Sequence, residues 1–304
     1  MEFLWESFPI FRRLLSLVLL SLLIPIGARL SAQGAPASPD PKDHYWWNGF
    51  GLPVFDGPIY DLATYDGRLV AAGWFTQASG AIANHVAIWS GDQWHPLGSG
   101  PGGPVRRLAI QGKKLHAGGL GGVASWNGTE WTPVGVCPLL DVTALLATDD
   151  ELVAAGRVGD RSSLVVRWDG ETWTSVGDTI RGGVYDLAIY ADELIACGDL
   201  TIPGDSLCHG LVARFDGVAW RRTLGGRSCF LVVGFGVDDF FATDLTVFGD
   251  DLIVSGYFDA VLDGRACSTV LSWDGNRWHC LAAGPPGMFA TQLLDLDGQL
   301  IVGG

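Results

Sequence analysis

Residues 168–177 read WDGETWTSVG, and this stretch decides the fold because close variants of it recur along the chain. In each copy, turn residues that include Gly follow an aromatic residue, and a Trp stands five positions after that aromatic. The pairs are Trp89 with Trp94, Trp126 with Trp131, Trp168 with Trp173, Phe215 with Trp220, and Trp273 with Trp278. Their first members are 37, 42, 47 and 58 residues apart. A period of about 45 residues suits four strands and their loops in one repeat.

One complete repeat shows why the elements are strands. The apolar stretches Ile59–Tyr65 and Leu69–Ala72 flank an Asp-Gly turn, which predicts an antiparallel hairpin. After an expected loop at 76–84, Val86–Trp89 forms a third strand and Trp94–Leu97 a fourth. The stretches are apolar on both faces, as expected for sheets packed between neighbouring sheets.

The repeats predict an all-β fold, a β-propeller of four-stranded antiparallel blades with about five complete blades and a partial sixth. The composition agrees, with 43 Gly and 13 Trp but only 2 Met. The expected propeller domain is 44–304, with units at about 59–98, 105–135, 142–177, 184–224, 242–281 and a partial unit at 291–304. Trp47–Leu52 resembles a fourth strand, so the sixth blade would combine both ends and lack a third strand. We therefore expect that the chain is truncated after Gly304, and a defective sixth blade is the alternative.

Residues 1–32 have the pattern of a secretory signal peptide. Arg12 and Arg13 precede an apolar run, Leu14–Ile26, and small residues follow it. The run falls short of the about 20 residues that span a bilayer, so we expect no stable transmembrane span in the mature chain, although an uncleaved anchor is the alternative. Residues 33–43, rich in Pro, Ala and Asp, are expected to be a flexible lead-in. The sequence thus predicts a secreted or cell-surface protein.

The net charge of −14 argues against a nucleic-acid partner. Most of the acidic residues are Asp in Asp-Gly turns, so turn formation and solubility explain this charge better than capture of cations.

The motifs Asp66-Gly67-Arg68-Leu69, Gly73-Trp74-Phe75 and Trp168–Trp173 resemble those of bacterial secreted kelch-like or galactose-oxidase-like propeller repeats. The shared pattern, DG-x-L-x-x-GG-x-F followed by W-DG-x-x-W-x-x-L-G, extends over 47–304. This resemblance implies the architecture and leaves function open, because propellers host hydrolases, oxidases, lectins and scaffolds.

No catalytic or cofactor-binding set is predicted. Ser272–Trp278 approaches the Asp-box of sialidase propellers but lacks the residue between Asp and Gly. A copper oxidase would need two His and two Tyr at one pole, whereas the His residues here fall in different units at non-equivalent positions. The A-x-D-x-x-TG-x-x-x-W pattern of quinone-dependent dehydrogenase propellers is absent. We expect a non-enzymatic protein without a cofactor.

One weak candidate site is the third position of each first strand, where first strands would line a central channel. Around the repeats this position holds Asp61, Arg107, Ala144, Asp186, Asp244 and Gln292. Asp61, Asp186 and Asp244 are candidates to bind a cation or a polar ligand. Channel water or neighbouring backbone N–H groups are the alternative partners.

Two further residue types have structural interpretations. The repeated Trp residues bracket the turn between strands three and four, which favours packing between blades over stacking on sugars. Six Cys in an exported chain are compatible with disulfides or with free buried thiols, and the most plausible pairs are Cys197 with Cys208 and Cys267 with Cys280.

The leading hypothesis is a non-enzymatic extracellular binding or adhesion scaffold whose ligand is an unidentified protein or glycan, with the loops between strands two and three as the variable rim. The alternative is a carbohydrate-active propeller, either a lectin or a glycosidase. Exposed Trp residues clustered with carboxylates would favour this alternative.

Overall fold

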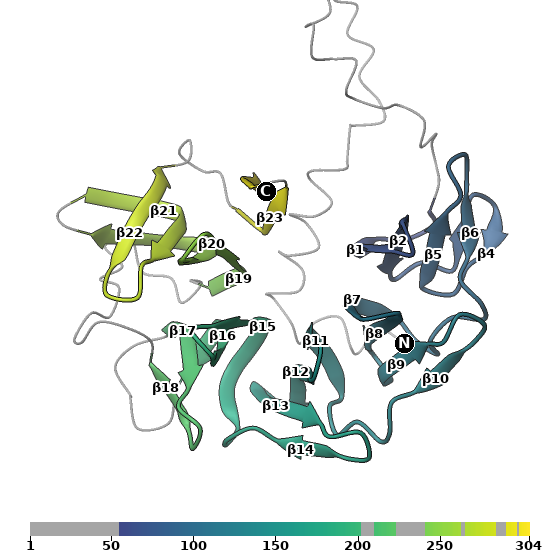
Figure 1. Cartoon of the computed structure of the whole chain (residues 1–304), viewed down its shortest axis with the longest axis horizontal. Coiled ribbons are helices and arrows are strands. Elements are labelled where there is room, and N and C mark those ends of the chain that lie inside the picture. The colour runs from purple at the N-terminus through teal and green to yellow at the C-terminus, as the bar shows by residue number, and fades with distance from the viewer. Residues whose placement is uncertain (1–54, 202–209, 223–240, 263–264, 284–289, 297) are drawn as a thin grey trace, which may run out of the picture. The chain divides into compact units, whose positions relative to one another are not determined.

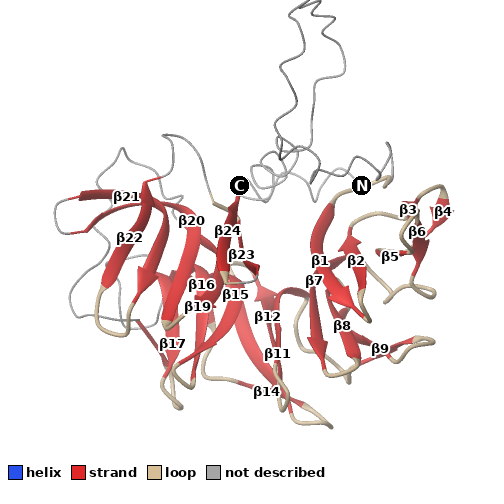
Figure 2. Cartoon of the chain, turned by 45° about the horizontal axis from the view of Figure 1, so that its top comes forward, coloured by secondary structure: helices blue, strands red, loops and turns tan. Residues whose placement is uncertain are grey.

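The computed structural model describes residues 55–201, 210–222, 241–262, 265–283, 290–296 and 298–304. Every regular element within these ranges is a β-strand, all strand pairs are antiparallel, and no helix occurs there (Figure 2). The all-β prediction is confirmed. The expected signal peptide, the lead-in and the Trp47–Leu52 strand lie outside the described residues.

Three sheets contain four strands each, paired mostly in chain order (Figure 1). The first contains β1 (Ile59–Tyr65), β2 (Arg68–Gly73), β5 (Val86–Trp89) and β6 (Trp94–Pro96). The second contains β7 (Val105–Gln111), β8 (Lys114–Gly119), β9 (Gly122–Trp126) and β10 (Trp131–Pro133). A later sheet contains β19 (Phe241–Phe248), β20 (Asp251–Leu262), β21 (Arg265–Trp273) and β22 (Trp278–Ala283). These strands match the expected units.

The third and fourth units depart from expectation because they share one eight-stranded sheet. Its strands are β11 (Asp141–Ala147), β12 (Leu152–Gly159), β13 (Ser162–Trp168), β14 (Trp173–Ser175), β15 (Ile180–Tyr190), β16 (Glu193–Thr201), β17 (Gly210–Phe215) and β18 (Trp220–Arg222). The junction is a short pairing of β13 with β15, Ser162 with Arg181 and Ser163 with Ile180. It exists because β15 begins at Ile180, a fully buried side chain, rather than at the expected Val184.

Two small two-stranded sheets complete the described part. The expected loop at 76–84 contains a short hairpin, β3 (Gln77–Ala78) and β4 (Ala81–Ile82). The last sheet contains only β23 (Gln292–Leu296) and β24 (Gln299–Gly303), in agreement with the partial sixth unit.

A β-bulge recurs in the first strand of every unit from β1 to β19. The register shifts between the first and third residues of the repeat, as at Ile59/Asp61 and Val142/Ala144. The same shift occurs at Val105/Arg107, Val184/Asp186 and Ala242/Asp244. A bulge changes the direction of the side chains beside it, so the third-position residue has the same orientation in each unit.

The Gly near the end of each second strand exists because of this bulge. Gly73, Gly119, Gly156, Gly198 and Gly256 each pair with the first-position residue of the repeat, at which the bulge begins. A Cβ at any of them would overlap the carbonyl oxygen of the residue before that first position. The Gly of the repeat motif is therefore a requirement of close backbone approach.

The hydrophobic core lies between consecutive units. One cluster joins Ala144, Val153 and Val165 of the third unit to Val184, Leu187 and Trp220 of the fourth. The first strands also contact one another in chain order, β1 with β7, β7 with β11, β11 with β15, β15 with β19, and β19 with β23. Each unit is thus stabilised mainly by its neighbours.

Candidate functional site

The three channel candidates Asp61, Asp186 and Asp244 each bind the backbone of the following unit. In each case Oδ2 accepts the N–H of the residue after the equivalent third position. Leu108 donates to Asp61 at 2.7 Å, Leu245 to Asp186 at 2.9 Å, and Leu293 to Asp244 at 2.5 Å. The sequence left three kinds of partner open for these Asp residues: a bound ligand, channel water or backbone N–H groups. The structure shows backbone N–H groups. Each of these Asp side chains therefore connects its own unit to the backbone of the next one.

Arg107 occupies the same position in the second unit and points along the row of first strands. Its Nη2 donates to the Tyr185 carbonyl at 3.1 Å, a residue of the fourth unit. The third unit carries only Ala144 at the equivalent position, fully buried and small, which leaves space for the long side chain. Asp61, Arg107 and Asp186 therefore belong to one electrostatic cluster.

The surroundings favour the neutral form of the Asp61 and Asp244 carboxyls. Burial raises the pKa of Asp61, while Arg107 and the backbone N–H donors oppose that change. Burial and the neighbouring Asp186 carboxyl raise the pKa of Asp244 to about 8. Within the described ranges, no group of three or more His, Cys, Asp and Glu side chains has the arrangement of a metal site.

A second polar cluster at the bulges could not be predicted from the sequence. Arg106 lies with its guanidinium carbon 5.6 Å from the ring centre of Tyr60, and its Nε is 2.8 and 2.9 Å from the two carboxylate oxygens of Asp141. This ion pair is largely buried and joins the first three units. Burial raises the pKa of Tyr60, so the phenol keeps its proton at neutral pH.

The repeated aromatic pairs pack inside the protein, as expected from their positions. Ring centres within a pair are 5.4 to 5.6 Å apart. The Trp of a fourth strand also donates Nε1–H to the preceding unit: Trp131 to the Leu97 carbonyl at 2.8 Å, Trp173 to Val134 at 2.6 Å, and Trp220 to Val176 at 2.8 Å. These residues do not form an exposed sugar-stacking platform.

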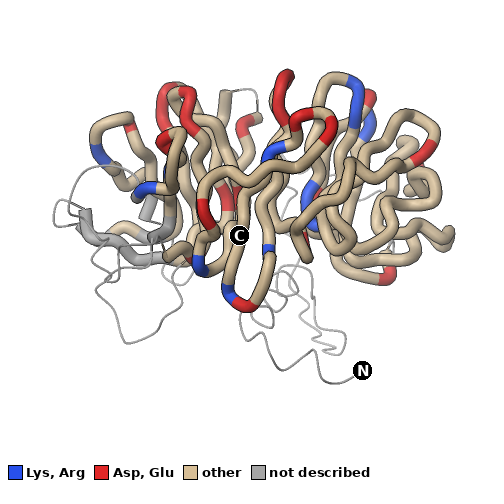
Figure 3. The backbone as a smooth tube through the Cα atoms, turned by 90° about the horizontal axis from the view of Figure 1, so that it is seen from below, with Lys and Arg blue, Asp and Glu red and all other residues tan. Residues whose placement is uncertain are grey.

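The turn between strands three and four uses acidic side chains as local acceptors. Asp169 Oδ1 accepts the N–H groups of Glu171 at 2.8 Å and Thr172 at 2.6 Å. Asp216 and Asp274 make the same pair of bonds in their own turns. Many Asp and Glu residues accordingly mark turns of the backbone (Figure 3). Much of the acidity thus serves turn formation.

One of the two expected disulfides is present. Cys267 and Cys280 are bonded with a Cα–Cα distance of 5.6 Å. The prediction of a Cys197–Cys208 bridge is wrong, because Cys197 is a free thiol. It lies within β16 and packs fully buried against Val254 and Leu271 of the next unit, so its side chain faces the core. Cys208 itself lies outside the described residues.

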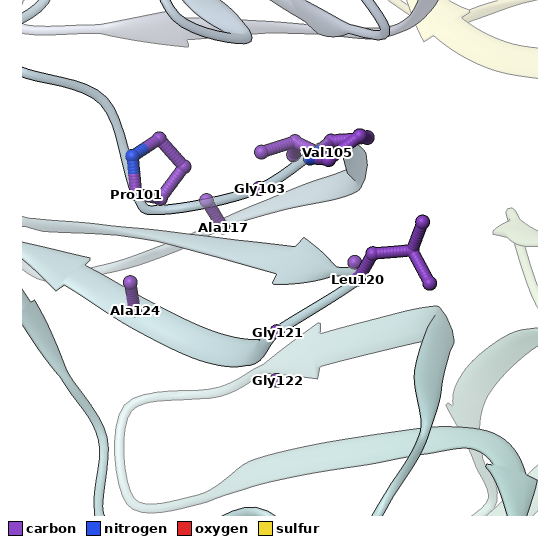
Figure 4. A pocket seen from close by; sticks show the side chains of 10 residues that line it. Pro101, Gly103, Val105, Ala117, Leu120, Gly121, Gly122 and Ala124 are labelled. Atoms are coloured by element: carbon purple, nitrogen blue, oxygen red, sulfur yellow. The ribbon is translucent and has the colours of Figure 1, made fainter.

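A small pocket beside β8 offers little chemistry (Figure 4). Gly, Ala and Pro make up most of its lining, together with Val105 and Leu120. It contains no ionisable side chain, so main-chain groups are its only polar features.

The described His residues are dispersed. His95 lies on β6, His116 on β8 and His279 on β22, where it contacts Asp274 at 2.7 Å. His116 is only 4% exposed, and neither of its ring nitrogens has a hydrogen-bond partner. Burial, with a smaller effect from Lys114, lowers its pKa to about 4. His116 is therefore neutral at physiological pH.

We expect His116 to destabilise the protein in acid. The unfolded chain takes up a proton near pH 6.5 and the folded chain only near pH 4, so stability falls as pH decreases between these values. At pH 5 the expected loss is about 2 kcal/mol relative to neutral pH. Urea unfolding of His116→Phe should no longer show this decrease in stability between neutral pH and pH 5. His95→Phe is the control, since His95 is exposed, and equal acid sensitivity of both variants would refute the assignment.

Comparisons with known proteins support the fold alone. No family model and no curated protein matches the sequence. A B. thetaiotaomicron structure, described as the extracellular domain of a hybrid two component system, aligns over 81% of this chain and 31% of its own with TM-score 0.54 and 12% identity. A second from that organism, described as the extracellular domain of a one component system, aligns over 84% and 38% with TM-score 0.51 and 9% identity. This chain spans about a third of the length of both.

No helix with the length and apolarity of a membrane span occurs among the described residues.

Proposed function

We propose that this chain is an extracellular β-propeller that acts as a non-enzymatic binding or adhesion scaffold. The observation that carries the proposal is that the repeated polar and aromatic side chains make contacts between units. The Asp residues of the first strands and the Trp residues of the fourth strands bond to neighbouring units. A rigid framework of this kind leaves recognition to the loops.

Several observations support the extracellular location. The sequence begins with a signal-peptide pattern, and Cys267 and Cys280 form a disulfide, which persists in oxidising compartments. The two similar B. thetaiotaomicron structures are described as extracellular domains.

The loop between β2 and β5 is the best candidate for ligand contact in the first unit. Trp74 is 50% exposed and Ile82 is 72% exposed, so this loop presents two large apolar side chains to solvent. Asp56 fixes this loop, since its carboxylate accepts bonds from Thr76 N at 2.7 Å, Thr76 Oγ1 at 2.6 Å and Gln77 N at 2.8 Å. An ordered loop pays less conformational entropy on binding.

The exposed Trp74 also supports the alternative, a lectin-type propeller. An exposed indole can stack on a sugar ring. The other described Trp residues contribute to packing, so the glycan would be recognised at the loop rather than along the repeats.

We expect that the mature chain binds one class of extracellular polymer and that Trp74→Ala weakens this binding at least tenfold. The measurement is retention of the chain on immobilised cellulose, chitin, xylan and peptidoglycan, and on beads carrying a panel of extracellular proteins. Val218→Ser is the matched control, because Val218 is 80% exposed on the turn between β17 and β18. Binding that both variants retain would exclude the loop, and release of reducing sugar would overturn the non-enzymatic assignment.

A further inference from the structure

Two carboxyl groups, Asp186 on β15 and Asp244 on β19, meet at one backbone N–H. Leu245 N lies 2.9 Å from Asp186 Oδ2 and 3.1 Å from Asp244 Oδ1. The two carboxyls thus converge on a single donor, and the Asp186 carboxyl is one of the groups that raise the pKa of Asp244. Two carboxylates that share one donor repel each other when both are ionised, which favours a proton on one of them.

We propose that Asp186 and Asp244 share one proton and form a pH-sensitive clasp that holds the β23–β24 sheet to the preceding unit. The clasp reaches that sheet through Asp244 Oδ2, which accepts Leu293 N–H at 2.5 Å. Loss of the proton to solvent base would leave two like charges in contact.

The groups around the pair do not cancel this effect. Arg107 of β7 is the neighbouring cation, and it favours ionisation of Asp244 less than burial and Asp186 oppose it. Asp61 of β1 adds a further carboxyl to the cluster. The Cys197 thiol of β16 stays neutral, because burial and the two carboxyls raise its pKa.

The β23–β24 sheet is the element that this clasp controls most directly. Both strands are largely exposed, and their apolar residues Leu294 and Ile301 are 56% and 43% exposed. Besides the clasp, Thr243 Oγ1 donates to the Ala290 carbonyl at 3.2 Å, and Leu293 and Leu300 pack against a small buried cluster that contains Ile253, Val270 and Ala290. Because both strands are largely exposed, this sheet should open at lower cost than the earlier sheets when the hydrogen bond to Asp244 is lost.

The proposal is tested by hydrogen exchange of the full chain between pH 5 and 8. Because the closed clasp holds a proton that the open form releases, protection of the Leu293 amide should fall about tenfold per pH unit. Asp244→Asn stays neutral and should make protection independent of pH. Asp61→Asn is the matched control, since Asp61 accepts the Leu108 N–H of the next unit in the same way but lies on β1, and it should keep the wild-type slope.

A second measurement needs no variant. Carbon-13 NMR of the Asp carboxyl groups in the wild-type chain should show one group that titrates near pH 8. The proposal is overturned if every Asp carboxyl is ionised by pH 5, or if Asp61→Asn removes the titration while Asp244→Asn leaves it.

Discussion

Trp220→Ala should lower the free energy of unfolding by about 4 kcal/mol. Trp220 is 4% exposed, its ring centre lies 5.5 Å from that of Phe215, and its Nε1 donates to the Val176 carbonyl of the third unit at 2.8 Å. The substitution removes a large buried surface and leaves a carbonyl without its donor. Both losses fall on the contact between two units, where the core of this protein lies.

Urea unfolding followed by far-ultraviolet circular dichroism measures this loss, since the emission of 13 Trp residues would overlap. Trp220→Phe keeps most of the apolar area and should cost about 1 to 2 kcal/mol. Trp74→Ala is the matched control, because Trp74 is 50% exposed, and its effect should stay within about 0.5 kcal/mol. Equal losses for Trp220→Ala and Trp74→Ala would contradict the locking role of the repeated Trp.

The strands were predictable because they depend on local patterns. Two apolar runs around an Asp-Gly turn specify a hairpin, and β1 and β5 have the bounds expected from the sequence. The pairing of β13 with β15 could not be predicted, because it depends on how far Ile180 can bury against a neighbouring unit. The β3–β4 hairpin could not be predicted either, because each of its strands has only two residues.

The candidate site was predictable as positions but not as contacts. The spacing placed Asp61, Asp186 and Asp244 at equivalent sites, and it left open whether they bind a ligand or the backbone. Their partners are N–H groups of the following unit, which a bulge in each first strand brings within reach. Neither a bulge nor the inward direction of Cys197 leaves a signal in the periodicity of a strand that is apolar on both faces.

The bulge makes a second strong prediction, at the Gly that faces it. Gly156 on β12 pairs with Val142, and a Cβ there would overlap the Asp141 carbonyl oxygen. The overlap is with backbone, so a rotamer change cannot relieve it. Asp141 also holds Arg106, so a shift of this carbonyl would disturb the contact with the second unit.

We therefore expect Gly156→Ala to destabilise the protein by about 3 kcal/mol, the upper range for overpacking a core. Gly159→Ala on the same strand is the control, because a Cβ there has no neighbour within 4 Å, and its effect should be within about 0.5 kcal/mol. Both free energies come from the same urea titration. If the two variants are equally stable, the bulge is not the reason that Gly recurs at this position. The turn after the Gly must then explain the motif.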